Sequence, residues 1–98
     1  MTARAVWKYA IDLGTHAGVT EFQIPEGARF MHCASQGEAM CMWFEVPIRQ
    51  GEVLPTVQRG FRIVGTGDPA IGDHMSYVGT GVFADGRFVF HVYEVNYS

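Results

Sequence analysis

The chain has 98 residues, a length at which one domain buries its own core, so we expect a single domain over residues 1–98. Seven Lys and Arg residues against ten Asp and Glu residues give a net charge of −3, which disfavours direct nucleic-acid binding because such binding requires a basic surface. Only 17% of the residues are charged and 13% are aromatic, so we expect part of the apolar surface to meet another protein or subunit.

Membrane insertion and export are both disfavoured by the sequence. No apolar run approaches the ~18 residues of a transmembrane helix, and the N-terminal stretch MTARAVWKYA contains no apolar signal segment. We therefore expect an intracellular protein that does not bind membranes. In that compartment Cys33 and Cys41 are expected as reduced thiols.

Alternation of apolar and polar residues predicts four strands in the first half of the chain. In the first, AVWKYAI, three apolar side chains share one face: Trp7, Tyr9 and Ile11. The stretches VTEFQIP, ARFMHCAS and AMCMWFEV follow, each separated from the next by a turn that contains Gly. We expect each of these strands to pair antiparallel with the one that follows it.

The second half begins with an irregular loop around residues 47–60, where Pro47, Pro55 and two Gly exclude a long helix. FRIVGT resumes the strand pattern, and GDPAIGDH is rich in turn residues. In YVGTGVFADGRFVFHVYEV, Asp85-Gly86 is a strong signal for a type I′ hairpin. The sequence therefore predicts an all-β fold of about seven strands, a small antiparallel barrel or sandwich.

The tetrapeptide VGTG occurs twice, at residues 64–67 and 78–81. A two-residue loop at Asp85-Gly86 sets Thr80 opposite His91 and Val78 opposite Tyr93. The same register places two glycines opposite large apolar residues, with Gly79 facing Val92 and Gly81 facing Phe90. Neither copy has the spacing of a Walker or dinucleotide-binding loop. We interpret the repeat as sheet geometry, with an anion-binding nest at the first copy as the weaker alternative.

His32, Cys33 and Cys41 come close together if a hairpin forms at Gln36-Gly37. A three-residue loop would set Cys33 opposite Cys41, and a two-residue loop would set His32 opposite Cys41. Two thiols and an imidazole would begin a zinc site, but no Cys-x-x-Cys pair is present. Buried structural thiols are the favoured interpretation, and we expect no metal or other cofactor.

Catalytic chemistry has little support in the sequence. His91 is either a general base or a histidine satisfied by the Thr80 hydroxyl, and we favour the second. Asp68, Asp73 and His74 cluster in one loop, but Asp before Pro is ordinary turn chemistry. No nucleophile–histidine motif is recognisable, so we expect no enzymatic activity. Four aromatic residues are candidates for an interface: Trp7, Tyr9, Tyr77 and Tyr93.

Five short pieces together span nearly the whole chain: WKY, PEGA, FRIVGTGDP, YVGT and FVFHVYE. In these pieces the chain resembles a family of small uncharacterised proteins encoded mainly by bacteriophages and prophages. The resemblance implies a phage gene product acting in the cytoplasm of an infected bacterium. Proteins of this kind commonly bind and block host machinery, and no residue roles carry over from the family.

The leading hypothesis is a non-enzymatic inhibitor of a bacterial defence system, an anti-CRISPR protein among the options, whose partner is a host protein or protein complex. Its partner-binding residues are expected in two exposed segments: Arg49, Glu52, Leu54, Asp68, Asp73 and His74. The alternative is an oligomer that sequesters a nucleotide signal, with Arg59 beside a ligand-binding set: Arg62, Thr66, Asp68, Thr80 and His91. A virion or assembly component is a third option.

Overall fold

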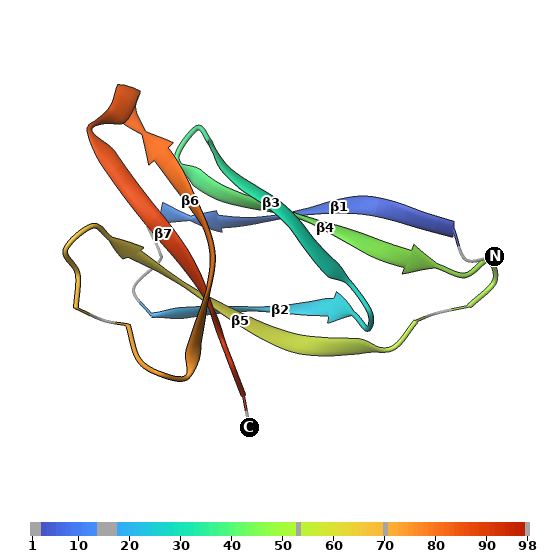
Figure 1. Ribbon diagram of the computed structural model, residues 1–98. Helices are drawn as coiled ribbons and strands as arrows, with labels where there is room; N and C mark the ends of the chain where they lie inside the picture. Colours follow the sequence, from blue (N-terminus) through green and yellow to red (C-terminus); the bar gives the residue numbers. More distant parts are fainter. Residues whose placement is uncertain (1–2, 14–17, 53, 70, 98) are drawn as a thin grey trace.

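In the computed structural model, which describes residues 3–13, 18–52, 54–69 and 71–97, the chain folds into two antiparallel sheets (Figure 1). The described residues form β1 (Ala3–Asp12), β2 (Val19–Pro25), β3 (Arg29–Gln36), β4 (Ala39–Ile48), β5 (Thr56–Gly65), β6 (Met75–Phe83), a short 3-10 turn η2 (Ala84–Gly86) and β7 (Phe88–Val95). One sheet has the order β1-β4-β3 and the other β2-β5-β7-β6. The predicted all-β fold is confirmed, and the two separate sheets make it a sandwich rather than a barrel.

The expected pairing of consecutive strands is wrong for the first two strands. β1 pairs with β4 and β2 pairs with β5, so among the described residues of this half the β3–β4 hairpin alone joins consecutive strands. The alternating pattern shows which face of a strand is buried but not which strand lies beside it, because every half-buried strand has the same period.

The irregular loop is shorter than expected. β4 continues through Pro47 to Ile48 and β5 begins at Thr56, so only residues 49–55 lie between the strands. Pro47 is tolerated because β3 begins at Arg29, opposite Glu45, so the position of the missing N–H of Pro47 faces the side that lies beyond the start of β3.

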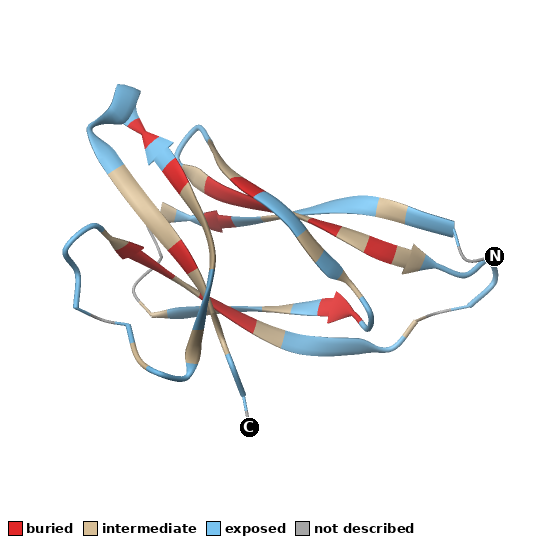
Figure 2. Ribbon diagram, viewed as in Figure 1, coloured by how far each residue is buried: buried red, intermediate tan, exposed pale blue. Residues whose placement is uncertain are grey.

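The core lies between the two sheets, and buried segments occur on strands of both (Figure 2). Phe44 on β4 is fully buried, and its ring meets those of Tyr9, Phe30 and Phe61 at centroid distances of 5.6, 5.7 and 6.0 Å. Tyr9, expected at an interface, instead packs edge-on against Phe22 and Phe44 in this cluster. Burial raises the pKa of Tyr9, which keeps its hydroxyl protonated.

The β6–β7 hairpin has the register expected from Asp85-Gly86. Gly79 faces Val92, Gly81 faces Phe90 and Thr80 faces His91, and the two central turn residues have φ values of 56° and 94°. A bulge at Val78 shifts the register of the β6 residues that precede it, so that Tyr77 rather than Val78 lies opposite Tyr93. The first GTG forms a turn in which the Asp68 N–H donates to the Gly65 carbonyl at 3.0 Å. The interpretation of the repeat as sheet geometry agrees with these positions.

The glycines of the second GTG let β6 approach the three-stranded sheet. A Cβ at Gly79 would overlap Sγ of Cys33, whereas one at Gly81 would lie 2.7 Å from Sδ and Cε of Met40, the far end of a flexible side chain. We expect Gly79→Ala to lower the free energy of unfolding by about 1–3 kcal/mol and Gly81→Ala by less than about 1 kcal/mol. Urea denaturation of the two variants measures this difference. Equal losses of unfolding free energy in the two variants would contradict the close approach of β6 to Cys33 at Gly79.

The C-terminal residues cross the outer face of the four-stranded sheet. The Tyr97 hydroxyl donates to Oε2 of Glu21 on β2 at 2.8 Å, and Gln58 donates to the same carboxylate. Gly60 on β5 lies opposite Glu21, and a side chain at this position would overlap the Tyr97 hydroxyl. Both hydrogen bonds lower the pKa of Glu21 below its ordinary value of 4.5, and the same contact raises the pKa of Tyr97.

This contact predicts an acid-sensitive contribution to stability. Because the pKa of Glu21 is lower in the folded state, the contact contributes fully above pH 4.5 and is lost as the pH falls through the lowered value. We expect Tyr97→Phe to reduce the drop in melting temperature between neutral pH and pH ~3 while keeping the ring in place. An unchanged pH profile in this variant would contradict the prediction.

Candidate functional site

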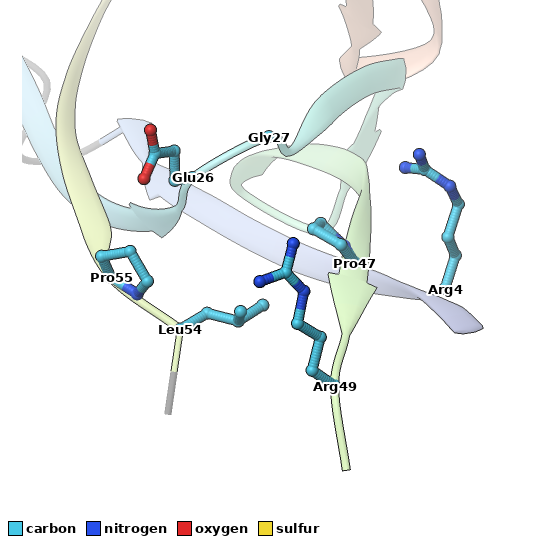
Figure 3. A pocket seen from close by; sticks show the side chains of 7 residues that line it. All are labelled: Arg4, Glu26, Gly27, Pro47, Arg49, Leu54 and Pro55. Carbon is cyan, nitrogen blue, oxygen red and sulfur yellow. The ribbon is translucent and has the colours of Figure 1, made fainter. Parts of the chain in front are cut away.

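The end of the sandwich where β2 and β4 end and β5 begins is hollowed. Two adjoining hollows of about 450 and 370 Å³ share Pro47, Arg49 and Leu54 in their walls, and we call them together the end cleft. The first is also lined by Arg4, Glu26, Gly27 and Pro55, and the second by Trp7, Gln23, Pro25, Ile48, Glu52 and Thr56. Figure 3 shows the first hollow, with the side chains of Leu54 and Arg49 extending toward each other.

Exposed apolar side chains of β1 and β4 line the end cleft. Trp7 projects from the inner side of β1, opposite Phe44, yet is 45% exposed, and Ile48 at the end of β4 is 40% exposed. Leu54 is half-buried between them and the start of β5. Large apolar groups in a concave site beside charged residues are typical of a binding surface.

The rim of the cleft carries an ion pair in a tight turn. Nη1 of Arg49 lies 3.7 Å from Oε2 of Glu52, and both side chains are 61% exposed. The Glu52 N–H donates to the Arg49 carbonyl at 3.1 Å, and Gly51 in this turn has a φ of +76°, which favours glycine. An exposed pair of this kind contributes at most about 1 kcal/mol, so both side chains are able to re-pair with a partner.

Three of the six residues expected to bind a partner therefore lie together at the end cleft, and three do not. Asp68, Asp73 and His74 lie in the loop between β5 and β6, at the other end of β5 (Figure 1). All three are exposed, and the His74 carbonyl accepts from the Asn96 N–H at 2.7 Å. The ten-residue β5 separates the two segments, so one compact epitope does not include both.

The outer face of the four-stranded sheet brings together most of the alternative ligand-binding set. Thr80 Oγ1 lies 2.9 Å from Nδ1 of His91, and Thr66 Oγ1 lies 3.0 Å from Nε2 of the same ring. The Tyr77 hydroxyl extends this chain to Thr80 at 2.6 Å. The favoured interpretation of His91 as a histidine satisfied by Thr80 agrees with this geometry, and its second partner, Thr66, was not anticipated.

The other members of the set are placed differently. Arg62 lies opposite Tyr93 on this outer face, and its Nε is buried without a hydrogen-bond partner among the described residues. Asp68 lies beyond the end of β5, in the turn where its N–H donates to the Gly65 carbonyl. Arg59 points into the sandwich, where it donates to both carboxylate oxygens of Glu94 at 2.7 and 2.8 Å. The suggested role of Arg59 as a phosphate contact is therefore at odds with its structural position.

Neither alternative register expected for the cysteine hairpin is present. Gln36 pairs with Ala39, which sets Ala34 opposite Cys41 and Cys33 opposite Met42. The two thiols consequently lie on opposite faces of the sheet, both buried and unbonded to each other. Burial raises the pKa of the Cys33 thiol. The described residues contain no group of three or more His, Cys, Asp or Glu side chains placed to hold a metal ion.

The fold and the end cleft define a two-sheet β-sandwich with a concave apolar surface at one end. Over residues 2–98 the chain matches the model of a domain of unknown function, DUF7352, and it belongs to that family. No curated protein and no solved structure is similar to it. None of the helical segments in the described part of the chain is long and apolar enough to cross a membrane.

Proposed function

We propose that this protein is a non-enzymatic binding protein that acts by contact between the end cleft and another protein. The observation that carries the proposal is the 45% exposure of Trp7 in a cleft that also contains Leu54 and the Arg49–Glu52 pair. An exposed aromatic anchor in an apolar hollow with a charged rim has the composition of a binding hot spot.

The chemistry of the cleft specifies the kind of contact. An apolar side chain of the partner would fill the space beside Trp7 and Leu54, and the opposite charges on the rim would fix its orientation. We propose a component of a bacterial defence system as the target and a phage as the source, a context supported by the resemblance of the sequence to phage-encoded proteins. Inhibition would be stoichiometric, because binding alone blocks the target.

The test expresses the protein in bacterial strains that each carry one defence system, and scores recovery of phage plating. Where plating recovers, calorimetry with the purified target is expected to show binding that Leu54→Glu weakens about 10- to 100-fold. Met31→Glu is the matched control, because Met31 is also an exposed apolar residue, 49% accessible on β3, and lies outside the cleft lining. Equal affinity of the wild type and of Leu54→Glu for the target would overturn the assignment of the end cleft as the binding site.

A second candidate function is the sequestration of a nucleotide signal by an oligomer. The observation in its favour is the chain of Tyr77, Thr80, His91 and Thr66, which lies beside the Tyr77–Tyr93 ring pair with a centroid distance of 5.7 Å. An exposed tyrosine offers a stacking surface for a base, and hydroxyls offer hydrogen bonds to a ribose. Native mass spectrometry that detects a bound nucleotide, lost in Tyr77→Ala, would favour this function over the first.

A further inference from the structure

The outward edge of β1 carries backbone groups that no other strand of the described chain pairs with. β1 is an edge strand of its sheet, and its one neighbour in the described residues is β4. The Leu13 N–H donates to the Glu38 carbonyl at 3.1 Å, so Leu13 and Glu38 form a hydrogen-bonded pair of the β1–β4 ladder. Hydrogen-bonded and non-hydrogen-bonded pairs alternate along an antiparallel ladder. By alternation, the N–H and C=O groups of the even-numbered residues of β1 point away from β4.

The other three sheet edges carry features that hinder pairing with a further chain. β3 contains a bulge at Met31 and β6 contains one at Val78. The two strands also contact each other, because the Ser35 hydroxyl donates to the Val82 carbonyl at 2.6 Å. β2 is shorter, at seven residues, and ends at Pro25. β1 runs for ten residues without proline, glycine or a bulge. Natural proteins seldom leave such a strand edge open.

We propose that β1 pairs antiparallel with β1 of a second copy of this chain, about a two-fold axis at Trp7. The interface is a strand edge that shares Arg4 and Trp7 with the lining of the end cleft, whereas Arg49, Glu52 and Leu54 lie outside it. In this register Val6 lies opposite Lys8 of the second copy, and Arg4 lies opposite Ala10. The four residues present their N–H and C=O groups to the edge, so a nine-residue stretch, residues 3–11, pairs in each copy.

The charges of β1 and the length of the paired stretch together select this register among the symmetric ones. An axis at Lys8 would place two lysines opposite each other, and an axis at Val6 would place Arg4 opposite Lys8. An axis at Tyr9 would shorten the paired stretch to residues 6–12. The axis at Trp7 opposes an uncharged residue to each charged one.

The same axis covers apolar surface that one copy leaves open. It brings the two Trp7 rings together at a non-hydrogen-bonded pair, where opposite Cα atoms are about 4.5 Å apart. Trp7 is 45% exposed and Val6 55% exposed in the single chain. The equal length of the paired stretches, the absence of like-charge pairs and the Trp7–Trp7 contact point to a second copy rather than an unrelated strand as the occupant. The result is a continuous six-stranded sheet.

Two experiments on the full chain test the proposal. Sedimentation equilibrium is expected to show a dimer for the wild type, and Val6→Pro is expected to raise the dimer dissociation constant roughly 10- to 100-fold. The N–H that proline removes points to the free edge, so the β1–β4 ladder stays intact, as circular dichroism would verify. If the proline variant fails to fold, Val6→Lys replaces it, because it sets a lysine opposite Lys8 of the second copy.

Cysteine cross-linking tests the register itself. Under oxidation Trp7→Cys is expected to give a disulfide-linked dimer, because the pair at the axis lies within disulfide range. Ala3→Cys, on the same face of β1, is expected to give none, since residue 11 lies opposite it. A monomeric wild type, an unaffected dimer in the Val6 variants, or cross-linking of Ala3→Cys in preference to Trp7→Cys would each overturn the proposal. A monomer whose Val6 variants lose binding to a partner protein would assign the edge to that partner instead.

Discussion

Replacing Phe44 with alanine is expected to lower the free energy of unfolding by about 3–5 kcal/mol. Phe44 is fully buried, and its ring meets three others, those of Tyr9, Phe30 and Phe61. Truncation removes these contacts and leaves a cavity between the sheets that the surrounding strands fill only in part. Urea denaturation followed by circular dichroism measures the loss.

The matched control is Phe88→Ala. Phe88 is also a strand phenylalanine but is 56% exposed beside the hairpin turn, so its removal is expected to cost less than about 1 kcal/mol. Because Phe44 lies on β4 and Phe61 on β5, the ring cluster joins the two sheets, and the Phe44 variant is expected to unfold both together. Similar losses in the two variants, or separate transitions for the two sheets, would contradict this account of the core.

Local signals in the sequence were sufficient for the hairpin of β6 and β7. Asp85-Gly86 fixes both the turn and the register through Thr80 and His91, because positive φ at both central residues admits few side chains. The bulge at Val78 has no comparable local signal. It moves Tyr77 opposite Tyr93 and so assembles an aromatic pair on the outer face that the simple register excluded.

The pairing of strands that are distant in the sequence could not be predicted from the sequence. Arg49, Glu52 and Leu54 were expected to act together because they share one loop. Their proximity to Trp7 depends on the pairing of β1 with β4, and the meeting of Thr66 with His91 depends on the pairing of β5 with β7. Single-strand periodicity contains no information about such partners. The candidate sites were consequently predictable in part, wherever one turn or one hairpin held the residues.

Arg59 illustrates the same limit, because its role depends on three elements that are distant in sequence. It donates two hydrogen bonds to Glu94 on β7 and a third, through Nη1, to the Ala28 carbonyl at 3.1 Å. Its guanidinium carbon also lies 4.9 Å from the centroid of the Phe44 ring. The ion pair therefore closes one side of the aromatic cluster, with 21% and 23% of the two side chains exposed.

Replacing Glu94 with leucine is expected to lower the free energy of unfolding by about 2–3 kcal/mol, a value below that of fully buried pairs because water still reaches both groups. The variant leaves the Arg59 charge over the ring cluster without its carboxylate. Arg59→Met, which keeps an apolar stem beside Phe44, is expected to cost less, and the double variant about 1–2 kcal/mol less than the sum of the two single variants. Denaturation of all four proteins in parallel measures this coupling. Strict additivity would mean that Arg59 stabilises the fold through its stem and ring contacts alone, and that the bidentate pair orients the guanidinium without adding to stability.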